Sequence, residues 1–255
     1  MPRTYMSTEK QTIEKNPLIE AMFKVGAHLG YSKSRRHPST SPYIFGAKNR
    51  VEIIDLEKTA ELLEKAKNYV RMVASERGQI LFVSGKKEAE RSIRKAAEAL
   101  LMPHVPGRWI GGTFTNFSEI RKRIERLEDL TRKREKGELG QYTKKERLLI
   151  DREIITLDAL FGGLIPMKQI PKTLFVIDSR KEDIAVTEAR KLNVPVIALA
   201  GSDCNIKDIE YPIVANDASV HSIEYFLDEI VAAYKEGLLK AAPKVEAPIK
   251  ARGRI

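Results

Sequence analysis

The segment VSGKKEAE, at residues 83–90, has the residue types of a phosphate-binding loop. Gly85 and Lys86 follow an apolar run typical of a strand and precede a helical pattern, and the free N–H groups at a helix start can hold a phosphate. The motif is incomplete, because six residues instead of four separate Gly78 from Gly85, and Lys87 replaces the Ser or Thr that binds magnesium. Nucleotide hydrolysis therefore stays an alternative hypothesis.

Metal binding and nucleophilic catalysis have little support in the sequence. The four histidines, His28, His37, His104 and His221, show no spacing typical of a metal site. Cys204 is the only cysteine, so an internal disulfide cannot form, which suits a reducing compartment. No GxSxG nucleophile elbow occurs. We predict no catalytic residue, no cofactor and no metal ligand, and whether His28, His37 or Cys204 bind zinc stays open.

Positive charge is concentrated in two segments. The chain has 45 Lys and Arg against 35 Asp and Glu, a formal charge of +10. Residues 21–51 contain no acidic side chain, and their six cations are Lys24, Lys33, Arg35, Arg36, Lys48 and Arg50. Residues 238–255 have five cations and one carboxylate, which adds +4, so the rest of the chain is balanced. This distribution favours a surface that binds nucleic-acid phosphates, although a solvated loop and tail would share it.

The elements that must position these residues follow an α/β pattern. Helices are expected at 17–25, 57–75, 86–101, 182–192 and 218–239, and strands at 51–54, 79–83, 102–105, 173–177, 196–200 and 212–214. Apolar strands that alternate with helices indicate a parallel sheet covered on both faces, a doubly wound domain. The basic loop, residues 26–50, is rich in Gly, Ser and Pro and is expected to be irregular. Since such sheets bind ligands beyond the C-terminal ends of their strands, an enzyme would use Ser84, Gly85, Lys86 and Asp178.

One insertion interrupts the alternation. Two charged helical stretches, 117–136 and 143–161, are separated by a turn that contains Gly137 and Gly140. Each stretch has apolar residues at spacings of three and four, which fits a projecting antiparallel coiled-coil hairpin. The predicted organisation is an N-terminal arm (1–16), a first part of the α/β domain (17–116), the hairpin (117–161), a second part of the α/β domain (162–240) and a basic C-terminal tail (241–255).

Several motifs occur in one order over most of the chain, from about residue 20 to residue 240. They are GAHLGY, RRHPSTSPYIFGAKNRVEIIDLEKT, ILFVSGKK, GRWIGGTFTNF, YTKKE, LFGGLIPM and LFVIDSRKEDIAVTEARKLNVPVIAL. Each motif alone is weak, but the ordered set is highly specific. Together they closely resemble the bacterial form of the small ribosomal subunit protein two family.

The resemblance implies a flavodoxin-like parallel sheet with a projecting helical hairpin, on the solvent side of the small subunit between its head and body. It also implies binding to small-subunit ribosomal RNA, contact with neighbouring small-subunit proteins, no catalysis and no cofactor. In many bacteria the family helps to dock small-subunit protein one, which is therefore a candidate partner. The polar N-terminus (1–15) and the longest apolar run (194–200) predict neither export nor a membrane span, so we expect a cytoplasmic protein.

Applied residue by residue, the resemblance places RNA contacts in the PYIFG region, the helix start after ILFVSG and the RWxGGxxTN segment. The predicted RNA-binding residues are Lys33, Arg35, Arg36, Tyr43, Lys48, Arg50, Lys86, Lys87, Arg108, Trp109, Thr115 and Asn116. Guanidinium groups pair with phosphates, aromatic rings stack on exposed bases and Asn reads base edges. For Trp109, packing in the core is an equally weighted alternative.

The chain departs from the family pattern at several positions. Ser39 and Ser41 stand where the family is commonly more basic, and Tyr31 stands where it often repeats a histidine. His37 stands where the family usually has Trp, which weakens a stacking role there, and residues 201–206 (GSDCNI) replace a usual acidic turn without an assignable role. A third hypothesis besides RNA binding and nucleotide binding is an adaptor whose hairpin binds only protein.

Overall fold

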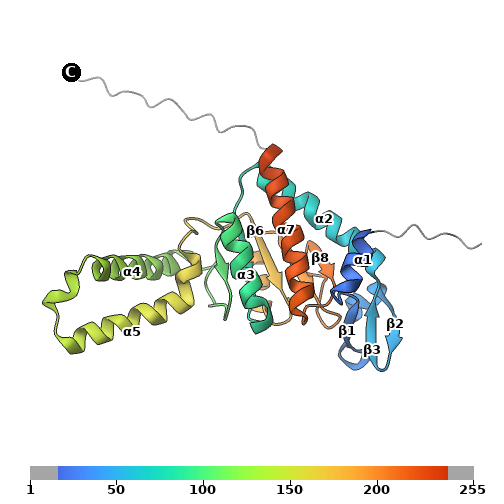
Figure 1. Cartoon of the computed structure of the whole chain (residues 1–255), viewed down its shortest axis with the longest axis horizontal. Coiled ribbons are helices and arrows are strands. Elements are labelled where there is room, and N and C mark those ends of the chain that lie inside the picture. The colour runs from blue at the N-terminus through green and yellow to red at the C-terminus, as the bar shows by residue number, and fades with distance from the viewer. Residues whose placement is uncertain (1–16, 241–255) are drawn as a thin grey trace, which may run out of the picture.

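A five-stranded parallel sheet forms the centre of the part of the chain that the computed structural model describes, residues 17–240. The predicted arm (1–16) and tail (241–255) lie outside this range. The strands are β4 (Ile80–Val83), β5 (His104–Val105), β6 (Thr173–Ile177), β7 (Val196–Ala200) and β8 (Tyr211–Val214), in the spatial order β5-β4-β6-β7-β8 (Figure 1). Numbered one to five along the chain, this is the order 2-1-3-4-5 of flavodoxin-like sheets, so the predicted fold class is confirmed.

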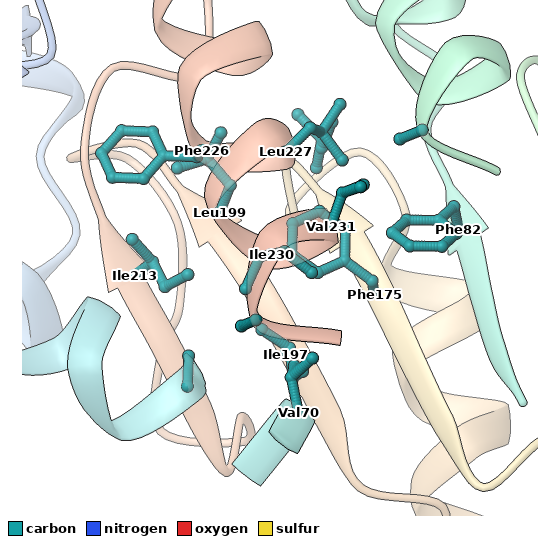
Figure 2. Packing of buried hydrophobic residues seen from close by; sticks show 14 of the residues in the cluster. Val70, Phe82, Phe175, Ile197, Leu199, Ile213, Phe226, Leu227, Ile230 and Val231 are labelled. Atoms are coloured by element: carbon teal, nitrogen blue, oxygen red, sulfur yellow. The ribbon is translucent and has the colours of Figure 1, made fainter. Parts of the chain in front are cut away.

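Alternate residues of each strand face opposite sides of the sheet, and both sides are covered. Ile80 and Phe82 belong to one apolar cluster, and Leu81 and Val83 belong to the other. The first cluster includes residues from α2 (Leu56–Ser75), α3 (Lys87–Leu100) and α7 (Val220–Lys240). Figure 2 shows α7 side chains, among them Phe226, packed against this face of the sheet. Burial on both faces explains why these strands read as continuous apolar runs.

The second face is covered by α6 (Asp183–Lys191) and by the base of a helical hairpin. The hairpin consists of α4 (Phe117–Glu135) and α5 (Lys144–Phe161), and it stands out from the sheet (Figure 1). Its helices bury the apolar stripes that the spacing predicted: Ile120, Ile124 and Leu127 on α4, and Ile154, Leu157 and Phe161 on α5. A capping box of Thr143 and Glu146 fixes the start of α5.

The basic loop folds into part of a second, three-stranded antiparallel sheet, where irregular structure was expected. The strands are β1 (Leu29–Ser32), β2 (Ile44–Lys48) and β3 (Val51–Ile54), in the order β1-β3-β2. β3 therefore does not belong to the parallel sheet. Asn49 and Arg50 connect β2 to β3 with φ angles of 51° and 67°, a two-residue turn of the type that matches the twist of a hairpin.

The helices begin and end within a few residues of the predicted bounds. The first, α1 (Pro17–Lys24), packs on α2, whose start is capped by Asp55 through the N–H groups of Glu57 and Lys58. Between residues 17 and 240, no helix has the length and apolar character needed to cross a membrane.

Candidate nucleic-acid interface

The turn at residues 201–206 attaches the basic loop to the C-terminal edge of the parallel sheet. Ser202, just after β7, accepts a hydrogen bond at Oγ from the N–H of Tyr31 (2.9 Å). Its carbonyl oxygen accepts from the N–H of His37 (2.9 Å) and from the hydroxyl of Thr40 (2.7 Å). Thr40 and Ser202 are fully buried. Residues 201–206, which had no assignable role from their types and spacing, therefore hold the basic loop in one position.

Asp203, in the same turn, holds two arginines. Its Oδ2 lies 3.4 Å from Arg35 Nη2 and 2.9 Å from Arg180 Nη1, while its side chain is only 6% exposed. The guanidinium of Arg35 also lies over the ring of Tyr31, with 4.7 Å from Cζ to the ring centroid. The side chains of Arg35 and Arg180 remain 55% and 58% exposed. Both arginines are thus oriented by the protein and still accessible to a ligand.

Three cations of the basic loop are exposed and have no ion-pair partner among the described residues: Lys33, Lys48 and Arg50. Arg50 lies in the β2–β3 turn, and its side chain is exposed. Arg36 differs, because its Nη1 lies 3.3 Å from Glu52 Oε1 and only 31% of its side chain is exposed. The free positive charge of the loop therefore resides on Lys33, Lys48 and Arg50, with a share from Arg35.

Lys86, which the sequence analysis placed among the RNA-binding residues, forms ion pairs inside the protein. Its Nζ lies 2.7 Å from Asp217 Oδ2 and 2.8 Å from Asp178 Oδ2, and its side chain is 11% exposed. Burial by itself would lower the pKa of Lys86, but the two carboxylates outweigh it and hold the pKa above its ordinary value. The ammonium therefore neutralises an internal acidic pair and is not available to a phosphate.

The strand-end site that a nucleotide would occupy is filled by the chain itself. The N–H of Gly85 donates to Glu182 Oε1 at 2.8 Å, and the N–H of Lys86 donates to Ser84 Oγ at 3.1 Å. These are the donors with which a phosphate loop would hold its ligand. Because both are occupied and the lysine is paired inside, the nucleotide-binding alternative loses its physical basis.

One group of side chains within residues 17–240 has the spacing of a metal site, namely Asp178, Cys204 and Asp217. His28 and His37 do not belong to it. The ammonium of Lys86 already binds both carboxylates, and burial raises the pKa of the Cys204 thiol to about 12, so this group stays protonated at neutral pH. The Lys86 ammonium thus supplies the positive charge between Asp178 and Asp217 that a metal ion would otherwise supply.

The RWxGGxxTN segment is held by a buried carboxylate on α6. The N–H groups of Gly112, Phe114 and Thr115 donate to Glu188 at 2.6, 2.9 and 3.3 Å. Burial would raise the pKa of Glu188, but these three donors outweigh it and the pKa lies below its ordinary value. Trp109 is 6% exposed and packs edge-on against Phe114, which supports core packing, one of the two alternatives for this residue.

The remaining predicted residues lie on separate surfaces. Thr115 and Asn116 are exposed just before α4, and Arg108 is exposed and lines a hollow with Gly85 and Lys181. Lys87 is exposed at the start of α3, and Tyr43 is half-buried in a groove with residues of α2 and β8. The structure therefore does not bring all of the predicted residues together.

A cavity of about 600 Å³ between the basic loop and α6 contains arginines that the sequence reasoning missed. Arg35 and Arg36 line it from one side, and Arg180 and Arg190 line it from the other. Arg180 follows the end of β6 by three residues, in the DSRKED motif. Its position beyond a buried strand was a usable signal, since that edge of a doubly wound sheet is where ligands bind.

Fold and site together define a class: a doubly wound protein whose own side chains close the usual ligand site and whose exposed cations are displayed on a rigid loop. The comparisons with known proteins agree with this class. The family model described as "Ribosomal protein S2" matches residues 22–237. The chain is also 40% identical over 233 residues to "Small ribosomal subunit protein uS2" of Salinibacter ruber (strain DSM 13855 / M31), an alignment that covers 91% of this chain and 73% of that protein.

The chain belongs to the ribosomal protein S2 family. It is a structural protein of the small ribosomal subunit and not an enzyme. The family resemblance that the ordered motifs indicated is confirmed.

Proposed function

We propose that the chain is held in the small ribosomal subunit by a surface formed by its basic loop, residues 26–50, together with the arginines at the adjoining sheet edge, and that this surface binds small-subunit ribosomal RNA. The observation that carries the proposal is the state of Lys33, Lys48 and Arg50, which are exposed and unpaired among the described residues. No acidic residue lies between residues 21 and 51 to neutralise them.

Because the basic loop is attached to the rest of the protein, its cations are held in a defined arrangement that RNA can recognise. Ser202 and its neighbours hold the loop at Tyr31, His37 and Thr40. A fixed loop presents its cations to RNA without first losing conformational entropy, which strengthens binding. Contacts to phosphates set the position and orientation of a protein on folded RNA, as a structural component requires.

A second surface is proposed for protein partners. Leu148, Leu149 and Ile155 are exposed on α5 of the projecting hairpin, where solvent-facing positions of a helix are usually polar. We assign this surface to a neighbouring small-subunit protein, with small-subunit protein one as the candidate. Replacing the three residues with Ser is expected to release the partner from the subunit while RNA binding stays unchanged. Loss of RNA binding, or retention of the partner, would contradict the assignment.

Co-sedimentation with small ribosomal subunits tests the RNA proposal. The tagged variant carries Lys33→Ala, Lys48→Ala and Arg50→Gly, the last because glycine tolerates the positive φ of that position. A matched control removes three exposed lysines at other sites, Lys168, Lys191 and Lys235. We expect the loop variant to leave the subunit at a lower salt concentration than the wild type and the control. Equal retention of all three proteins would refute the proposal.

A further inference from the structure

The cavity between the basic loop and α6 has the donors of a specific phosphate site. Two of its arginines, Arg35 and Arg180, come from segments far apart in the sequence and meet at one carboxylate oxygen, Asp203 Oδ2. A single carboxylate neutralises only one of the two guanidinium groups. Each guanidinium has five N–H donors in a fixed plane, and each bonds Asp203 through only one nitrogen.

The other charged groups of the cavity do not supply the missing negative charge at this point. Arg190 pairs with Asp208 at 2.8 Å, and Arg36 pairs with Glu52 at 3.3 Å. Asp183 also lines the cavity, at the start of α6. The four lining arginines outnumber the three lining carboxylates by one, which matches the single charge of a phosphodiester, whose two free oxygens a guanidinium fork can bind.

We infer that Arg35 and Arg180 form a clamp for one backbone phosphodiester of RNA, and that Asp203 is the positioning residue that makes their side chains converge. The inference deepens the proposed function and rests on it. Asp203 is suited to this role because its side chain is buried in the turn that fixes the basic loop. The ring of Tyr31 lies under the guanidinium of Arg35 and limits the orientations that this arginine can adopt.

The test measures the affinity of the purified chain for small-subunit ribosomal RNA at several KCl concentrations. The variants are Arg180→Gln and Asp203→Asn, with Arg134→Gln as the control because Arg134 is an exposed arginine at the end of α4. Thermal unfolding of each variant verifies that the fold is retained. We expect Arg180→Gln to weaken binding about tenfold and to reduce the slope of log affinity against log salt by about 0.7 to 0.9, the value for one lost phosphate contact. Arg134→Gln is expected to leave both quantities near the wild-type values.

Asp203→Asn separates positioning from general electrostatics. The substitution removes a negative charge, so attraction alone predicts tighter binding, whereas the clamp predicts weaker binding because the two guanidinium groups no longer converge. Tighter binding by Asp203→Asn, or a wild-type affinity for Arg180→Gln, would overturn the clamp. Absence of salt-dependent RNA binding by the wild type would instead refute the proposed function itself.

Discussion

Lys86 and Asp217 form an internal ion pair, with 2.7 Å between Nζ and Oδ2, at the strand ends where doubly wound sheets usually bind a ligand. Asp178 completes the pair from the neighbouring strand end at 2.8 Å. The Lys86 ammonium thus occupies the position at which a protein of this fold usually binds its ligand. Its surface, in contrast, displays unpaired cations on the basic loop. This division separates the structural ion pair from the residues proposed to bind RNA.

Replacement of Lys86 by Met is expected to destabilise the protein by about 3 to 5 kcal/mol at neutral pH, because the buried Asp217 and the partly buried Asp178 lose their counter-charge. Burial already holds the pKa of Asp217 above its usual range, although Lys86 opposes this. Without Lys86 that pKa rises further, so the folded state binds a proton that the unfolded state releases, and stability falls as pH rises between the two pKa values. Urea unfolding at pH 5 and pH 7.5 measures the difference, with partial recovery expected at the lower pH.

The neighbouring substitution Lys87→Met provides the control, because Lys87 is exposed. It is expected to change stability by less than about 0.5 kcal/mol. In the wild type, the raised pKa of Lys86 means that the ion pair contributes fully below the unfolded pKa and is lost only as pH rises through the higher folded value. Identical unfolding midpoints for the two variants at pH 7.5 would show that the buried pair does not stabilise the fold.

Replacement of Glu188 by Gln is expected to loosen the base of the hairpin. The amide retains one acceptor oxygen for three backbone donors, and the loss is on the order of 3 kcal/mol. Because the pKa of Glu188 is lowered in the fold, its contribution is present above the unfolded pKa and is lost as pH falls through the folded value. Hydrogen exchange of the Gly112, Phe114 and Thr115 amides should accelerate at pH 7, and unchanged exchange would contradict this. Glu61→Gln, at an exposed position of α2, is the control.

Gly237 permits the close approach of α7 to α2. A Cβ at this position would lie 2.6 Å from Ala74 Cβ and 2.5 Å from the carbonyl oxygen of Arg71. Helix propensity favours Ala over Gly by about 1 kcal/mol, yet we expect Gly237→Ala to lower the free energy of unfolding by about 1 to 3 kcal/mol through overpacking. Gly140→Ala, where an added Cβ meets nothing within 4 Å, is the matched control. A stabilised Gly237→Ala variant would exclude this close contact.

Local patterns in the sequence predicted the parallel sheet and the helical hairpin, because strands buried on both faces and narrow apolar stripes are visible in short windows. The three-stranded sheet escaped prediction, since the pairing of β1 with β3 depends on partners outside any local pattern. The Gly, Ser and Pro content of the basic loop indicated irregular structure instead. The basic loop is held in place by Ser202, which accepts a hydrogen bond from Tyr31 although it lies 171 residues later in the sequence.

Individual site residues were harder to predict for the same physical reason. Lys86 looks like an exposed helix start until Asp217, 131 residues later, is placed beside it. Trp109 has equal reasons to pack or to stack, and only the position of Phe114 decides. Arg180 gains its proposed role from Asp203 and from Arg35, which is 168 residues away from Asp203. Contacts of this range cannot be read from residue types and spacing alone.

The unpaired cations of the basic loop are proposed to bind ribosomal RNA. The most direct measurement is the affinity of the purified chain for small-subunit ribosomal RNA across a series of KCl concentrations, compared between the wild type and the Lys33→Ala, Lys48→Ala and Arg50→Gly variant. Three lost phosphate contacts should reduce the magnitude of the slope of log affinity against log salt by about 2 to 3. A slope and an affinity identical to those of the wild type would contradict the claim.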